Sequence, residues 1–163
     1  MVETCGFFGT FIETRYGGYP VPVPPGDEKV AYDVHCFCGL IDSDGMACVL
    51  DQPQAERRAM FRSLRKLGMA KLVDFTKKAA TALRRSGRSL HRKQDRSAIS
   101  GLLRPFEDIY FKRLRTQAYS RLYRHIISSE AFIPYMLNCE RMEKEGGNPF
   151  DPKEWTPEKL KDL

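Results

Sequence analysis

The residue types best suited to chemistry form one cluster in the first third of the chain. His35, Cys36 and Cys38 are nearly contiguous, and Cys48 follows shortly after them. Tetrahedral zinc sites need four nitrogen or sulfur ligands, commonly in closely spaced pairs. Here the fourth ligand would have to come from a cysteine far along the chain. We therefore favour cysteines buried as small apolar side chains, and we predict no metal and no cofactor.

Signatures of catalysis do not accompany this cluster. A nucleophilic cysteine beside His35 or His125 is an alternative, but no family signature surrounds any cysteine. Asp42 and Asp44 resemble the start of a calcium loop, whereas Pro53 stands where an EF-hand needs its last glutamate. The sequence also lacks the glycine-rich, zinc-protease and serine-hydrolase patterns of common enzymes. We predict that the protein is not an enzyme; a small redox protein or enzyme using the cysteines is the alternative.

The charged residues are segregated along the chain. Twenty of the 27 lysines and arginines lie in residues 56–124 with five acidic residues, which gives that segment a net charge of +15. The acidic residues that usually pair with basic ones along a helix are nearly missing from it. A cationic middle segment predicts an anionic partner, which would be RNA, phospholipid headgroups or acidic protein. The side chains predicted to contact this partner are Arg57, Arg58, Arg62, Arg65, Lys77, Lys78, Arg84, Arg85, Arg88, Arg92, Lys93, Arg96, Arg121 and Arg124.

The overall composition fits one domain with a moderate core. The chain has 163 residues, of which 42% are hydrophobic. Its apolar runs fall far short of the roughly 20 residues that cross a bilayer, so we predict no transmembrane span. The first residues lack the basic and apolar regions of a secretory signal. Five cysteines, an odd number, fit a reducing compartment better than a disulfide scaffold.

The N-terminal part of the chain predicts an extended arm followed by a β-hairpin. Residues 19–26 carry alternating prolines, which fix φ, remove backbone donors and favour polyproline II. We expect the neighbours in a larger assembly to hold this arm, residues 1–29, in place. Apolar residues alternate from Val30 to Cys36, and a turn sequence at residues 42–45 follows. This pattern predicts a hairpin that ends near Leu50.

The remainder of the chain has helical periodicity. Apolar residues spaced by three and four predict one amphipathic helix over residues 54–86, in which Gly68 permits a bend. Residues 87–100 are polar and basic, and they predict a loop or a helix that orders on binding. A second helix is expected to start near Pro105 with acidic residues in its first turn. A third is expected over residues 134–145.

The predicted fold class is mainly α. We expect about three amphipathic helices with a small β-hairpin and extended N- and C-terminal arms. In this organisation residues 1–29 form the arm and residues 30–147 form the helical domain with the hairpin at its start. Residues 148–163 form a tail with a short helix at its end.

A tripeptide on the second predicted helix resembles a known motif. Leu122, Tyr123 and Arg124 stand between basic flanks. They are similar to the LYR motif of small mitochondrial helical proteins, many of which are accessory subunits or assembly factors of respiratory complexes. In that family the motif lies early in a three-helix domain and a phenylalanine follows downstream, whereas here about 40 residues follow the tripeptide and Phe132 comes soon after it. The resemblance implies an accessory role in a respiratory complex.

Three short segments also resemble the matrix-side 14-kDa subunit of the cytochrome bc1 complex. They are residues 66–69 (Lys-Leu-Gly-Met), 82–85 (Ala-Leu-Arg-Arg) and 134–137 (Pro-Tyr-Met-Leu), and together they cover 12 of the 163 residues. This resemblance implies a small peripheral subunit of a respiratory complex.

Charge, arms and resemblances together predict a non-catalytic structural accessory subunit of a large multi-subunit assembly. We expect a mitochondrial respiratory-chain complex, with the protein peripheral to the inner membrane on the matrix side. Its basic helices would face other protein subunits or anionic lipid headgroups. The alternative is an RNA-binding protein, ribosomal or mitoribosomal, whose basic segment neutralises phosphates with a steep salt dependence.

Overall fold

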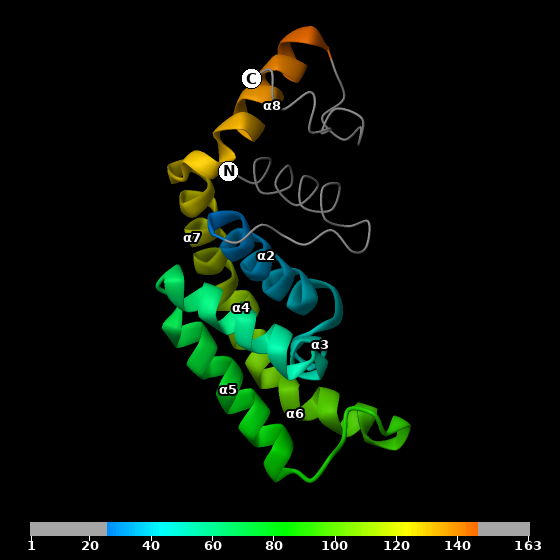
Figure 1. Ribbon diagram of the computed structural model, residues 1–163. Coiled ribbons are helices and arrows are strands. Elements are labelled where there is room, and N and C mark those ends of the chain that lie inside the picture. The colour runs from blue at the N-terminus through cyan, green and yellow to red at the C-terminus, as the bar shows by residue number, and fades with distance from the viewer. Residues whose placement is uncertain (1–25, 147–163) are drawn as a thin grey trace. The chain divides into compact units, whose positions relative to one another are not determined.

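The computed structural model describes residues 26–146, and within this range every regular element is a helix (Figure 1). The mainly α fold predicted from the sequence is confirmed, and the predicted β-hairpin is wrong. The chain divides into two compact units. One is formed by residues 33–122, and the other, in the described part of the chain, by residues 26–32 and 123–146. Residues 1–25 of the arm predicted over residues 1–29, and the whole tail predicted over residues 148–163, lie outside the described residues.

The segment predicted as a hairpin forms two helices, α2 (Asp27–Asp44) and α3 (Met46–Asp51). Val30 and Val34 fit the alternation of a strand, but they also stand four residues apart on one face of a helix. Phe37 and Ile41 continue that helical spacing, and all four side chains are buried. The apolar residues of this segment therefore follow the helical period of 3.6 residues. Helix α2 begins within the segment predicted as an extended arm.

Gly45 separates α2 from α3. The turn residues that indicated a hairpin instead end a helix, because the Gly45 amide donates to the Ile41 carbonyl at 3.0 Å. Gly45 has φ +82°, a conformation that glycine adopts without strain. A β-carbon at this position would lie 2.5 Å from Oε1 of Glu107. That oxygen accepts a hydrogen bond from the Met46 amide at 2.8 Å and so satisfies the start of α3.

Two helices, α4 (Gln54–Lys66) and α5 (Ala70–Arg85), replace the single helix predicted over residues 54–86. Gly68, at φ +71°, stops α4 with a Schellman motif. In this motif the Gly68 amide donates to the Arg65 carbonyl at 2.9 Å, and the Met69 amide donates to the Leu64 carbonyl at 2.8 Å. The two helices pack against each other and are joined at one end by this short turn (Figure 1).

The predicted helix start at Pro105 is also wrong, because α6 (Arg96–Ile109) begins well before it. A proline inside a helix cannot donate to the carbonyl four residues earlier. Pro105 and Gly101 are both exposed, so water can satisfy the carbonyl that is left over. A 3₁₀ turn, η1 (Lys93–Asp95), precedes α6. A π-helical segment, η2 (Tyr110–Leu114), joins α6 to α7 (Arg115–Ser128).

The unit of residues 33–122 has a continuous apolar core. Helix α5 packs against α3, α4 and α6, and α3 also packs against α6. Phe37 meets Phe61 edge to face, with ring centroids 6.4 Å apart, and Phe75 lies 5.4 Å from Phe106. The fully buried side chains at its centre include Phe37, Ile41, Met46, Val49, Leu64, Val73, Leu103 and Tyr110.

The second unit joins the start of α2 to the end of α7 and to α8 (Ile133–Glu145). The Ser129 hydroxyl donates to Oδ2 of Asp27 at 2.6 Å, and Nε2 of His125 lies 3.2 Å from the Asp27 carbonyl oxygen. Phe132, in the 3₁₀ turn η3 (Glu130–Phe132), is buried beside the His125 ring. The third predicted helix is confirmed as α8. None of the helices between residues 26 and 146 is long and apolar enough to cross a membrane.

Candidate anion-binding surface

Three of the four arginines of helix α4 lie on the side that faces away from the core. Arg58, Arg62 and Arg65 are exposed and follow a spacing of four and three residues, which aligns them along one side of the helix. Met60 and Leu64, on the opposite side, are buried. The amphipathic pattern of α4 therefore fixes which charged side chains point to solvent.

Helix α5 also carries exposed basic side chains. Lys77 and Arg84 are seven residues apart, as are Lys78 and Arg85, and all four are exposed. Arg84 and Arg85 also stand in the last turn, where the helix dipole favours positive charge. We call the predicted contact residues that are exposed on these two helices the basic face. They are Arg58, Arg62, Arg65, Lys77, Lys78, Arg84 and Arg85.

The connection between α5 and α6 continues the positive charge. Four predicted contact residues are exposed there, and we call them the basic connection. They are Arg88, Arg92, Lys93 and Arg96. Local hydrogen bonds fix the backbone between them: the Ser89 amide donates to Oδ2 of Asp95 at 3.0 Å, and the Asp95 amide donates to the Arg92 carbonyl at 3.0 Å. The connection is thus a loop and a 3₁₀ turn with a defined shape rather than a long helix.

Three predicted contact residues do not belong to this surface. Arg57 is half-buried and its guanidinium donates to the Leu50 carbonyl, which ties α4 to the end of α3. Nη1 of Arg121 donates to the Leu67 carbonyl at 2.9 Å. Arg124 is exposed and lies in the other unit. Arg57 and Arg121 therefore stabilise the fold, and eleven of the fourteen predicted side chains form the basic face and the basic connection.

The structure describes no ion pairs of the basic face and basic connection within residues 26–146. Their eleven side chains form no ion pair with the carboxylates that the structure describes there. Two of the nearby acidic groups serve the backbone, since Asp95 accepts a hydrogen bond from the Ser89 amide and Glu107 caps α3. Like charges at this density repel one another and lower the stability of the folded state. An anionic partner would relieve that repulsion.

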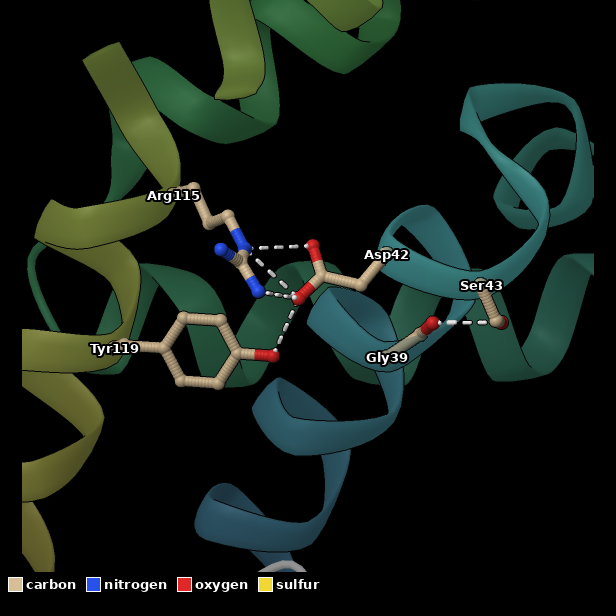
Figure 2. A network of polar contacts seen from close by, with 5 residues as sticks. All are labelled: Gly39, Asp42, Ser43, Arg115 and Tyr119. Carbon is tan, nitrogen blue, oxygen red and sulfur yellow. Dashed lines mark hydrogen bonds and ion pairs between the residues drawn. The ribbon is translucent and has the colours of Figure 1, made fainter. Parts of the chain in front are cut away.

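The carboxylate of Asp42, unlike these cations, has several hydrogen-bond partners within the unit of residues 33–122 (Figure 2). Nε of Arg115 donates to Oδ1 and Oδ2 at 3.0 and 2.9 Å, and Nη2 lies 2.9 Å from Oδ2. The Tyr119 hydroxyl donates to Oδ2 at 2.9 Å. The hydrogen bond to Asp42 raises the pKa of Arg115, and burial raises that of Tyr119. This network ties the end of α2 to the start of α7.

Cys36, Cys38 and Cys48 lie on helices and not on a strand. Cys38 is fully buried in the core of the unit, and burial raises the pKa of its thiol to about 12. A thiol with this pKa stays protonated at neutral pH and is a poor nucleophile or metal ligand. Cys36 and Cys48 are half-buried, and burial also raises the pKa of Cys48. The structure describes no group of three His, Cys, Asp or Glu side chains in residues 26–146 that could hold a metal ion.

The aromatic residues near the basic segment have separate roles. Tyr110 is fully buried, and Tyr119 donates to Asp42. Phe75, on α5, packs against Phe106. Phe111 is 44% exposed, but it belongs to η2 and not to the basic face. The basic face therefore presents charge without an exposed aromatic side chain on α4 or α5.

A second feature, which the sequence did not predict, is a hollow of about 830 Å³ within residues 33–122. The carboxylates of Asp42, Asp44, Asp51 and Glu107 line it, so we call it the acidic cleft. The remaining lining residues are Ile41, Ser43, Gly45, Ala47, Cys48, Leu90, Arg96, Ile99, Ser100, Leu103 and Phe111. Its walls come from α2, α3 and α6, which are distant in sequence, so no local pattern marks it.

Comparison with known proteins does not place the chain in a family. It matches no protein-family model, no curated protein sequence and no solved structure.

Proposed function

We propose that the protein is a non-catalytic structural accessory subunit of a large multi-subunit assembly, held there by an acidic protein surface. The carrying observation is the segregation of charge. Eleven exposed cations of the basic face and basic connection form no ion pair with the carboxylates described in residues 26–146, whereas Asp42, Asp95 and Glu107 serve the fold. Such a surface is suited to binding rather than to catalysis.

An acidic protein fits this surface better than nucleic acid or lipid. Proteins that bind single-stranded RNA usually stack bases on exposed aromatic side chains, and the basic face has none on α4 or α5. Insertion into a bilayer interface needs exposed apolar side chains next to the bases. The large exposed apolar residues among those described, such as Ile109 and Phe111, lie outside these two helices. RNA binding through phosphates alone is the second candidate function.

The affinity would come from many weak contacts. One exposed ion pair contributes about 0.2–1 kcal/mol, so four pairs contribute roughly 1–4 kcal/mol together. The attachment should weaken with salt, because surface charges are screened beyond a Debye length of about 8 Å at physiological ionic strength.

The assembly itself is proposed to be a mitochondrial respiratory-chain complex, with the protein peripheral on the matrix side of the inner membrane. Two observations support this finer proposal, namely the LYR-like tripeptide at residues 122–124 and the three segments similar to the cytochrome bc1 subunit. In the structure the tripeptide lies on α7, with Leu122 buried and Arg124 exposed.

Native-gel migration of the tagged endogenous protein, with and without ribonuclease, tests the proposal. We expect a large particle that survives ribonuclease and contains other protein subunits, including respiratory subunits under the finer proposal. A particle that collapses on ribonuclease treatment would instead establish the RNA-binding alternative. A protein that migrates alone under both conditions would contradict both functions.

A further inference from the structure

The acidic cleft is a local reversal of charge on a basic unit. Residues 33–122 contain nineteen lysines and arginines and nine acidic residues, and four of those nine line this one hollow. Two of the four, Asp42 and Glu107, already bind Arg115 and the Met46 amide. Asp44 and Asp51 are exposed and keep free acceptor capacity toward solvent.

The contacts of Asp44 and Asp51 are weak. The Ser43 hydroxyl donates to Oδ2 of Asp44 at 3.0 Å, and Nε2 of His91 lies 3.7 Å from Oδ1 of Asp51. The His91 side chain is 83% exposed, so this pair is well hydrated and easily replaced. Arg96 is the basic member of the lining, and it is exposed. A cation entering the cleft would therefore meet two carboxylates that the fold does not need.

Part of the lining of the cleft is apolar. Ile41, Ile99 and Leu103 are buried side chains that line it, and the half-exposed Phe111 ring also lines it. Burying the exposed part of the Phe111 ring on a partner would be favourable, because apolar surface would leave water. The size of the cleft, about 830 Å³, suits several side chains of a peptide better than a single ion.

We propose that the acidic cleft binds a cationic and apolar segment of a partner protein. Asp44 and Asp51 bind a lysine or arginine side chain of that segment, and the apolar lining with Phe111 accepts an adjacent apolar side chain. The positive charge elsewhere on the unit repels cationic segments, which confines such a segment to this cleft. The site goes beyond the proposed function, because its partner has the opposite charge to the one expected at the basic face.

A defined peptide can test this site on the full-length protein. The probe is a fluorescein-labelled twelve-residue peptide of alternating leucine and lysine, measured by fluorescence anisotropy at about 50 mM salt, where charges are little screened. Since the protein carries a net charge of +6, attraction to net charge cannot explain binding of this probe. The double variant Asp44→Asn/Asp51→Asn should weaken binding by about tenfold.

Matched controls separate the cleft from charge in general. Asp74→Asn/Asp108→Asn removes the same charge from exposed positions outside the cleft, and it should change affinity less than about twofold. Phe111→Ser should also weaken binding, because it removes the apolar part of the site. As a second route, Ala47→Arg places a cation in the cleft itself and should block the probe.

Three results would overturn the proposal. The first is no binding of the probe to the wild-type protein. The second is an equal loss of affinity in the cleft variant and the control variant. The third is an unchanged affinity in Phe111→Ser together with displacement of the probe by spermine at the affinity of the peptide, which would make the cleft a site for small polycations.

Discussion

The basic face and the acidic cleft use charge in opposite ways, although both belong to the unit of residues 33–122. The cations of the basic face point to solvent and form no ion pair with the carboxylates described between residues 26 and 146. In the acidic cleft, Asp42 and Glu107 hold α7 and α3 in place, and only Asp44 and Asp51 remain available. The exposed cations can therefore be changed without harm to the fold, whereas the carboxylates of Asp42 and Glu107 cannot.

The largest loss of stability is expected for Asp42→Ala. Arg115 and Tyr119 would lose their shared acceptor, and hydrogen bonds to charged groups contribute about 1.5–3 kcal/mol each. We expect urea unfolding to give a free energy of unfolding lower by roughly 2–3 kcal/mol. The neighbouring variant Asp44→Ala is the control and should change it by less than about 0.5 kcal/mol. If the two variants lowered the free energy of unfolding equally, Asp42 could not be called structural and Asp44 available.

Gly45→Ala should produce the next largest effect. A non-glycine residue at φ +82° is strained by about 1–2 kcal/mol, and its β-carbon would also displace the Glu107 carboxylate. We expect a lower melting temperature and, by amide hydrogen exchange, faster opening of α3. Gly39→Ala, inside α2 with open space around the new methyl group, should instead stabilise the protein by about 0.5–1 kcal/mol. A destabilised Gly39→Ala variant would contradict the helical assignment of this segment.

Glu107→Ala should lower the free energy of unfolding by a smaller amount, about 1 kcal/mol, because it removes one hydrogen bond to the Met46 amide. Asp108→Ala, at the exposed adjacent position, serves as the control and should be within about 0.5 kcal/mol of the wild type. A double-mutant cycle measures the coupling between Gly45 and Glu107. Gly45→Ala should cost less in the Glu107→Ala background, since the clash with the carboxylate is gone. Strict additivity would show that the two residues do not interact.

The smallest effect on stability is expected on the basic face. Arg84→Ala and Arg85→Ala should each change the free energy of unfolding by less than about 0.5 kcal/mol. Removing one of several like charges should even help slightly at low salt, because repulsion is least screened there. Thermal unfolding of the wild type and both variants at two salt concentrations measures this. A loss above 1 kcal/mol, as a rough bound, would mean that these arginines serve the fold.

The basic face could be predicted from the sequence because its cause is local. The spacing of Arg58, Arg62 and Arg65 sets their side of the helix wherever the helix packs. The segment before residue 50 was misread because Val30 and Val34 satisfy both a strand and a helix, and the turn sequence at residues 42–45 suits a hairpin as well as a helix end. Residues further along, Phe37 and Ile41, carried the signal that distinguishes the two.

The acidic cleft could not be predicted, because long-range packing creates it. Asp42 and Arg115 are 73 residues apart in the chain, and Met46 and Glu107 are 61 apart. Glu107 was expected to favour the start of its own helix, yet it lies within α6 and its carboxylate caps α3 instead. Arg57 and Arg121 were predicted to contact a partner, but their guanidinium groups bind backbone carbonyls. Charge alone does not distinguish such groups from those that face solvent.

The most direct test of the proposed docking is incorporation of a charge-reversed protein into its native assembly. The variant replaces Arg84, Arg85, Arg88 and Arg92 with glutamate. A matched control replaces four exposed bases outside the basic face and basic connection with glutamate, namely Arg104, Lys112, Arg113 and Lys144. Both should keep the helix content of the wild type by circular dichroism.

The amount of each protein in the large particle is then compared on native gels at equal expression. We expect the variant with Arg84, Arg85, Arg88 and Arg92 replaced to be depleted from the particle by at least about tenfold, because four attractive contacts become repulsive. The control variant should be incorporated at the level of the wild type. Equal incorporation of both variants would contradict the claim that the basic face and basic connection bind the assembly.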